Sequence, residues 1–193
     1  QKAISKNPRS TVGTITEVHD FLRLAFARAS DAFSLSTGEP MVRFTDEEIV
    51  ERIFHSLQGE RILILAPLIK GRKGHYRELF ESIMKQGYVR ARVDGVLVEL
   101  EPGMKLDRYK VHDIEVVVDR LEVKLDEEPR LLRSVKTALN MGKGTMGVLP
   151  HESKEFRHFS RNLMCPTTGE AYPDPEPNLF SFNSPYGACN RCN

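Results

Sequence analysis

The segment from Tyr88 to Leu100, YVRARVDGVLVEL, restricts the fold more than any other part of the chain. Its first half places two sets of side chains on opposite sides of a strand: Val89, Ala91 and Val93, and Tyr88, Arg90 and Arg92. This period-two alternation is typical of a strand with one buried face. Asp94-Gly95 is the residue pair that a two-residue primed turn favours. The segment therefore predicts a β-hairpin with one face on a core.

Two patterns predict helix starts. The segments 14–17 and 45–48 have the capping-box composition, in which a Thr hydroxyl and a Glu carboxylate bind each other's exposed backbone amides. Apolar residues at helical spacing follow both boxes: Val18, Phe21, Leu22, Ala25 and Phe26, and then Ile49, Val50, Ile53, Phe54 and Leu57. We therefore expect a helix from Val18 to about Arg28 and a second one that Gly59 terminates.

Strands and helices alternate through the rest of the middle of the chain. Aliphatic runs predict strands at 61–69, 112–123 and 144–150, and apolar spacing predicts helices at 75–85 and 127–142. Pro129 lies near the start of the last helix and Gly142 lies just past its end. Together with the hairpin, these elements predict a compact α+β domain of roughly 110 residues with three to four helices.

Composition excludes several classes of protein. The chain has 193 residues, 40% hydrophobic and 28% charged, with a formal net charge of +1, as is usual for a globular protein. The longest apolar run, Ile62 to Ile69, is far shorter than the roughly 20 residues of a membrane helix. Three cysteines near one end make no disulfide framework and favour a reducing cytoplasm. A start at Gln1 and an end just after Cys192 indicate a fragment of a longer chain.

The C-terminal part has the features of an incomplete zinc ribbon. Prolines interrupt the chain beyond His151, so this tail needs a metal ion or a parent domain to fold. Cys189 and Cys192 form a C-x-x-C pair at ribbon spacing from Cys165, but Thr168 stands where the fourth thiolate belongs. Neutral hydroxyls bind zinc poorly. Three alternatives follow: three cysteines with water, a fourth ligand from His151 or His158, or a ribbon that has lost its metal.

A basic stretch follows the first predicted strand. Lys70-Gly71-Arg72-Lys73-Gly74, with Arg77 close behind, is predicted to form a glycine-rich loop that can hold nucleic-acid phosphates. A solvated loop that keeps the domain soluble is the alternative. Gly71 to Gly74 also fits the G-x-x-G loop of a KH module, which would make the chain a free-standing nucleic-acid-binding module. A KH loop joins two helices, however, and a strand is predicted before Gly71.

The polar face of the hairpin is a candidate docking surface. Arg90 and Arg92 are predicted to be exposed there with Tyr88 alongside, and planar guanidinium groups bind carboxylates at two points. Ordinary solvent-facing arginines are the alternative. No catalytic constellation is evident, because the pairs His19-Asp20, His112-Asp113 and His151-Glu152 have no accompanying nucleophile. We therefore expect no active site in this fragment.

Five stretches resemble consecutive segments of the UvrA family of nucleotide excision repair ATPases: SKNPRSTVGTITEVHDFLRLAFAR, KGRKGHYRELFE, GYVRARVDG, HDIEVVVDRL and LFSFNSPYGAC. The resemblance implies an ATPase and signature framework at 1–32, a UvrB-binding domain at 33–150, and a return into the framework with a degenerate zinc module at 151–193. Gln1 would lie at a nucleotide site. The chain lacks a G-x-x-x-x-G-K-[ST] loop, so hydrolysis of ATP would belong to the parent protein.

The resemblance also implies partners and cofactors. UvrB would dock on the domain through Tyr88, Arg90 and Arg92, and damaged double-stranded DNA would lie beside it near Lys70, Arg72, Lys73 and Arg77. The full-length parent would be a UvrA dimer in the cytoplasm, and zinc would be held at Cys165, Cys189 and Cys192. Members of the family commonly have C-P-x-C-G at 165–169 and again at 34–38, whereas this chain has Thr168, Ser34 and Thr37 at three of the four cysteine positions. These replacements indicate a lineage with relaxed metal dependence.

Overall fold

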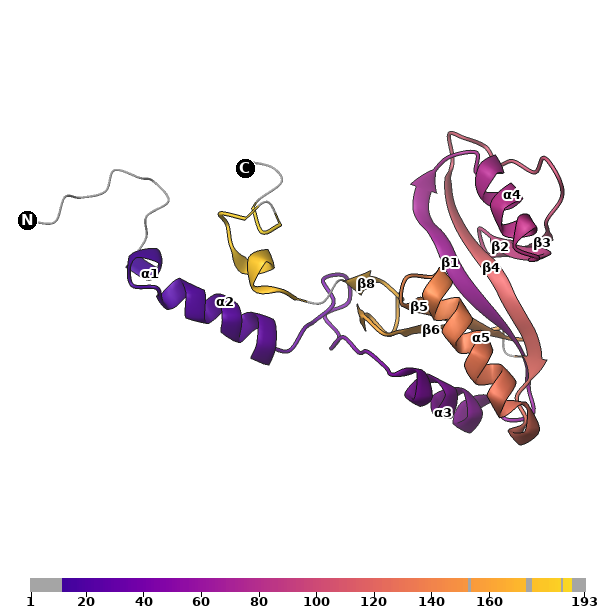
Figure 1. Cartoon of the computed structure of the whole chain (residues 1–193), viewed down its shortest axis with the longest axis horizontal. Coiled ribbons are helices and arrows are strands. Elements are labelled where there is room, and N and C mark those ends of the chain that lie inside the picture. The colour runs from indigo at the N-terminus through magenta and orange to yellow at the C-terminus, as the bar shows by residue number, and fades with distance from the viewer. Residues whose placement is uncertain (1–11, 153, 173–174, 185, 189–193) are drawn as a thin grey trace, which may run out of the picture. The chain divides into compact units, whose positions relative to one another are not determined.

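The computed structural model describes residues 12–152, 154–172, 175–184 and 186–188 (Figure 1). The chain divides into two compact units. Unit 2 is Phe33–Tyr172, and unit 1 combines the residues up to 32 with those from 173 on. Within the described ranges, no helix is both long enough and apolar enough to cross a membrane.

Unit 2 is built on a six-stranded antiparallel sheet in the order β3-β2-β4-β1-β5-β6 (Figure 1). The strands are β1 (Arg61–Lys73), β2 (Arg90–Val93), β3 (Val96–Glu99), β4 (Val111–Glu122), β5 (Thr145–Pro150) and β6 (Arg157–Ser160). Two short strands, β7 (Leu163–Met164) and β8 (Ala171–Tyr172), pair separately. The combination of sheet and helices confirms the α+β prediction.

Three helices and the inward-facing strand residues form one core. They are α3 (Asp46–Leu57), α4 (Arg77–Lys85) and α5 (Glu128–Met141), with a 3-10 turn η1 (Leu125–Glu127) before α5. Ala91 and Val93 of β2 and Ile114 and Val116 of β4 lie in this core together with Phe80 of α4. The side chains that alternate with them lie on the opposite side of the sheet, which we call the open face.

Both predicted helices are present, but the predicted capping box is found at the start of only one of them. At α3 the capping box is present, because Thr45 Oγ1 accepts from the Glu48 amide at 3.2 Å and Glu48 Oε2 accepts from the Thr45 amide at 2.7 Å. In unit 1, α2 (Val18–Ala29) follows Glu17, which has a φ of 63° and caps no amide with its side chain. A short helix α1 (Val12–Ile15) overlaps the first half of the segment 14–17, which was predicted to be the first box.

The hairpin is present, but its first strand begins later than predicted. Asp94 and Gly95 have φ values of 50° and 86°, as a primed turn requires. Tyr88 instead donates its amide to Ile83 O at the end of α4, and its side chain packs against the core. The prediction that Tyr88 shares a face with Arg90 and Arg92 is therefore wrong, because the strand alternation starts at Arg90.

The basic stretch is the end of a strand and not a loop. β1 continues to Lys73, with Arg72 opposite His112 and Lys73 opposite Val111 of β4. Gly71 makes this continuation possible, since its φ of 63° suits a bulge and its amide binds Asp113 Oδ1 at 2.6 Å. The residues from Gly71 to Gly74 therefore do not form the loop between two helices that a KH module needs.

The C-terminal part contributes to both units. β6 pairs with β5 and so extends the sheet of unit 2 beyond residue 150. In unit 1, the segment around Leu179 forms a 3-10 helix η2 (Pro177–Phe180). It packs on α2, where the rings of Phe26 and Phe180 lie 5.8 Å apart.

Candidate functional site

A groove of about 550 Å³ lies on the open face, over β1 to β5. Apolar side chains of four strands line it: Leu63, Leu97, Val117 and Leu149. Basic side chains surround them: Arg61, Arg90, Arg92, Arg120, His151 and Lys154. None of these lining residues is acidic. An apolar floor within a cationic rim is suited to an acidic partner with an apolar centre.

The rim contains both paired and unpaired cations. Arg90 binds Glu99 Oε1 at 3.0 Å, and this pair is largely exposed. Arg92 binds Glu115 Oε2 at 2.6 Å, with only 22% and 13% of the two side chains exposed. Arg61, Arg120 and Lys154 make no ion pair within the described residues. Their charges are therefore free to attract a partner.

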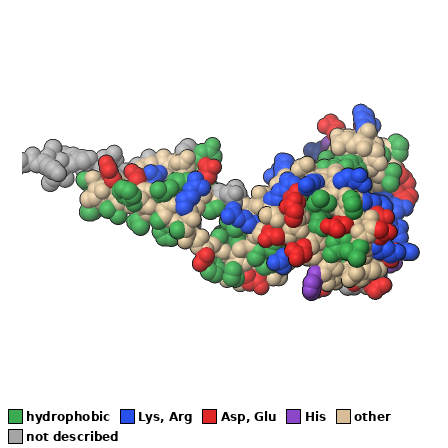
Figure 2. Space-filling model, turned by 60° about the horizontal axis from the view of Figure 1, so that its bottom comes forward, with side chains coloured by type: hydrophobic (Ala, Val, Ile, Leu, Met, Phe, Trp, Pro, Cys, Tyr) green, Lys and Arg blue, Asp and Glu red, His purple; other side chains and the backbone are tan. Residues whose placement is uncertain are grey.

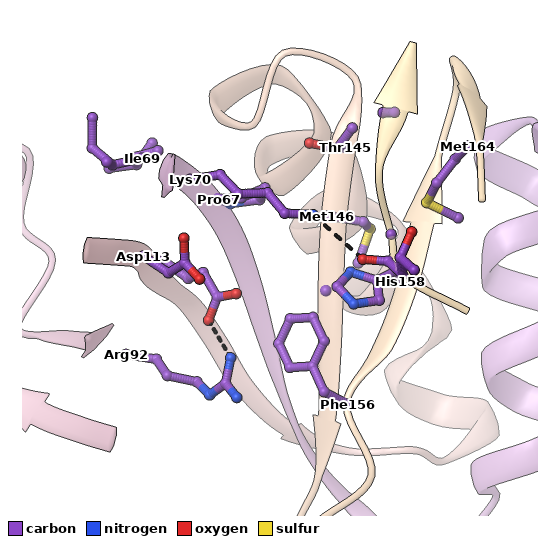
Figure 3. Close-up of a pocket in the computed structure, with 16 residues that line it drawn as sticks. Pro67, Ile69, Lys70, Arg92, Asp113, Thr145, Met146, Phe156, His158 and Met164 are labelled. Atoms are coloured by element: carbon purple, nitrogen blue, oxygen red, sulfur yellow. Dashed lines mark hydrogen bonds and ion pairs between the residues drawn. The ribbon is translucent and has the colours of Figure 1, made fainter. Parts of the chain in front are cut away.

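Arg92 lies in a stack of planar groups beside the groove (Figure 3). Its guanidinium carbon is 4.6 Å from the Phe156 ring centroid, and the Phe156 and His158 rings are 4.6 Å apart. Gly147 lies below the stack, where a Cβ would come within 2.1 Å of the Phe156 ring. The predicted docking residue Arg92 is thus held in a fixed position, and Arg90 is the more accessible member of the pair.

The stack borders a second hollow of about 460 Å³ whose titratable groups are perturbed. Burial lowers the pKa of His158 to about 4, helped by the positive charges of Lys70 and Arg92. Burial also raises the pKa of Glu115, although its ion pair with Arg92 opposes the effect. The Thr145 and Thr168 side chains also line this hollow, and the Thr145 hydroxyl donates to Gly142 O at 2.7 Å.

The four residues predicted to contact DNA do not form one cluster. Lys70 Nζ lies over the second hollow and donates to Thr168 O at 3.3 Å. Arg77 pairs with Glu81 at 2.9 Å on α4. Arg72 and Lys73 are exposed at the end of β1, where Lys110 precedes the paired Val111. On the face of unit 2 that Figure 2 shows, basic and acidic side chains are interspersed.

Cys165 is buried between two turns, one from each end of unit 2. Hydrogen bonds from Thr168, Thr37 and Ser34 lower the pKa of its thiol to about 6. Gln1, Cys189 and Cys192 lie outside the described residues, so the nucleotide contact and the three-cysteine zinc site stay predictions. Among the residues that the structure describes, no group of three or more His, Cys, Asp or Glu side chains is placed to hold a metal ion.

Sequence reasoning missed Arg61, Arg120 and Lys154, which complete the rim. Arg61 directly precedes the aliphatic run of β1, and its position at a strand end was the available signal. Arg120 gave a misleading signal, because regular alternation from Val116 would point it into the core. Lys154 follows the last strand predicted from the sequence and showed no pattern.

Comparison with known proteins matches the part of the chain that carries the groove. The family model described as "UvrA interaction domain" matches residues 45–152, which include β1 to β5 and α3 to α5. The chain belongs to the UvrA interaction domain family. It is 47% identical to the UvrABC system protein A of Thermus thermophilus over 194 residues, and also 47% identical to that of Methanothermobacter thermautotrophicus over 197 residues. It is 44% identical to the Pasteurella multocida protein of the same name.

Each of these matches covers all of this chain but only 20% or 21% of the relative. The chain therefore spans about a fifth of the length of the curated relatives that it matches. The matched interaction domain contains every groove residue except Lys154. The resemblance seen in the sequence is confirmed, and it coincides with the part of unit 2 that carries the groove.

Proposed function

We propose that unit 2 is the protein-docking module of a UvrA-type nucleotide excision repair ATPase and that its groove binds UvrB. The observation that carries this proposal is the apolar floor of the groove, surrounded by a cationic rim, with no acidic residue in the lining. Membership of the UvrA interaction domain family supports a binding role over a catalytic one. ATP hydrolysis, dimerisation and the cytoplasmic location are proposed for the parent protein.

The rim fits acidic side chains of the partner, and the floor fits an apolar anchor between them. Arg61 and Arg120 offer unpaired guanidinium groups that bind carboxylates at two points. Leu63 and Val117 supply the apolar surface that gains free energy when the partner excludes water. The Glu115 pair and the Phe156 stack hold Arg92 in place, so its guanidinium is ordered before binding.

The proposal is tested by titrating purified UvrB into this chain in a calorimeter. A saturable complex is expected at concentrations on the order of tens of micromolar or below. Its affinity should fall as salt is added, because unpaired rim charges steer and hold an acidic surface. Absence of heat and of complex in this range would refute docking by this chain.

Contact with DNA is a second proposal, supported by the exposed end of β1 and β4. Arg72 and Lys73 lie there with Lys110, so several cations can meet one phosphate backbone. Duplex DNA should bind weakly and with a steep dependence on salt concentration. Fluorescence anisotropy of a labelled duplex at two salt concentrations measures this, and salt-independent binding would contradict it.

A further inference from the structure

The two turns around Cys165 have the same local structure. Residues 34–39 read S-L-S-T-G-E and residues 165–170 read C-P-T-T-G-E. In both turns the first residue donates its amide to the carbonyl of the final Glu at 2.9 Å, and the Gly donates back to the first residue at 2.9 Å. Gly38 and Gly169 have φ values of 74° and 66°. We call these segments the twin turns.

The resemblance extends to the side chains. The Thr37 amide lies 3.4 Å from Ser34 Oγ, and the Thr168 amide lies 3.5 Å from Cys165 Sγ. The turns face each other, because Thr37 Oγ1 is 3.4 Å from Cys165 Sγ. Four thiolates around a zinc ion at about 2.3 Å would be about 3.8 Å apart. The side chains of Ser34, Thr37 and Thr168 all hydrogen-bond the Cys165 thiol. The twin turns therefore bring four side chains, two from each turn, together at one place, and the 3.4 Å between Thr37 and Cys165 is close to the spacing of a tetrahedral metal site.

The side chains themselves do not fit zinc. Protein zinc ligands are thiolate, imidazole and carboxylate groups, and three of the four converging side chains are neutral hydroxyls. Those hydroxyls already have partners within the twin turns. Ser34 Oγ is 3.0 Å from Ser36 Oγ, and Thr37 Oγ1 donates to Glu39 Oε2 at 3.2 Å.

A carboxylate links the two turns. Glu39 of the first turn accepts from Thr167 Oγ1 of the second at 2.7 Å, and the Cys165 thiol lies 3.8 Å from the same oxygen. Two backbone bonds of 2.9 Å between Val42 and Met164 continue the connection. The beginning and the end of unit 2 are thereby fastened together at one place.

We propose that the twin turns are a metal-free clasp, in which hydrogen bonds to Glu39 and Cys165 join two turns that have the geometry of a zinc site. The clasp holds the ends of unit 2 together whether or not zinc is available. Cys165 acts there as a hydrogen-bonding group and not as a zinc ligand.

Metal content tests the proposal directly. Zinc is measured by plasma mass spectrometry in the unmodified chain and in Cys165→Ser, both purified without chelator. We expect the same zinc content in both, whatever Cys189 and Cys192 bind. A full equivalent of zinc in the unmodified chain that disappears in Cys165→Ser would overturn the proposal.

A gain of metal binding tests the geometry of the clasp. Ser34→Cys, Thr37→Cys and Thr168→Cys are combined while Cys189 and Cys192 are replaced by Ser, so that the twin turns hold the four thiols. This variant should take up one equivalent of cobalt(II), with the strong visible absorption of a tetrahedral thiolate complex. The matched chain with Ser34, Thr37 and Thr168 retained should give no such absorption. Absorption in the matched chain, or its absence in a folded four-thiol variant, would contradict the proposal.

Discussion

Leu63 of β1 lies directly opposite Arg120 of β4, and both side chains line the groove. An apolar floor residue and an unpaired rim cation are thus neighbours across one strand pair. A bulge produces this arrangement, because Ile64 pairs with Asp119 and Leu65 pairs with Val117, leaving Val118 without an opposite residue. Beyond the bulge Leu121 lies in the core and Arg120 points to the open face.

The stack on the open face should depend on Gly147. We predict that Gly147→Ala lowers the free energy of unfolding by about 1–3 kcal/mol, because its Cβ would overlap the Phe156 ring. Urea denaturation measures this change. In a Phe156→Ala background the same substitution should cost much less, since the ring is gone. Equal costs in both backgrounds would show that the ring is not what restricts this position.

His158 should make the stability of unit 2 depend on pH. Its pKa is about 4 in the folded chain against an ordinary 6.5, so the unfolded state binds more protons between these values. The free energy of unfolding should therefore fall as pH decreases from 6.5 to 4. His158→Phe keeps a ring in the stack but cannot be protonated, and should reduce this dependence. An equally steep loss in His158→Phe would contradict the assignment.

The contribution of His112 to stability should depend on pH in the opposite direction. Its side chain is buried, and a hydrogen bond of 2.7 Å to Asp94 raises its pKa. A raised pKa means that its contribution is fully present below pH 6.5 and is lost as pH rises through the folded value. His112→Asn should therefore cost more free energy of unfolding at pH 6 than at pH 9. Proton NMR titration of the two imidazoles would check both directions.

The clasp should depend on Glu39 more than on its equivalent, Glu170. Glu39→Ala removes the acceptor shared by Thr37 and Thr167, so we predict a loss of about 1–2 kcal/mol in the free energy of unfolding. Glu170→Ala occupies the same position in the second turn but breaks no bond between the turns, and should cost less. Thermal denaturation with and without a chelator compares them. A larger loss in Glu170→Ala would contradict the role given to Glu39.

DNA contact should follow the end of β1 and not α4. Arg72→Ala and Lys73→Ala are predicted to reduce the salt dependence of duplex binding, because each removes about one phosphate contact. Arg77→Ala is the control, since Arg77 is already paired with Glu81. Anisotropy titrations over a range of salt concentrations give the slopes. An effect of Arg77→Ala alone would place the contact elsewhere.

Periodicity was enough to predict most of the elements of unit 2. The α3 capping box, the Asp94-Gly95 turn and α5 between Pro129 and Gly142 depend on local signals, and all three are present. The prediction failed where the local structure depends on contacts with residues that are distant in the sequence. Gly71 extends β1 only because Asp113 of β4 binds its amide, and no local pattern shows this.

The candidate site was only partly predictable for the same reason. Arg90 and Arg92 followed from alternation, but the bulge at Val118 is hidden in a run of three valines. The twin turns come from segments at opposite ends of unit 2. Their equivalent spacing was visible in the sequence, whereas their contact through Glu39 and Thr167 was not.

The most direct test of the docking surface is a calorimetric titration of UvrB into three forms of this chain. The forms are the unmodified chain, Arg61→Glu/Arg120→Glu, and the control Arg133→Glu, whose charge lies on the exposed side of α5. Docking in the groove predicts about tenfold or greater weakening for the double variant and an unchanged dissociation constant for the control. Equal affinities for all three forms would contradict docking at the groove.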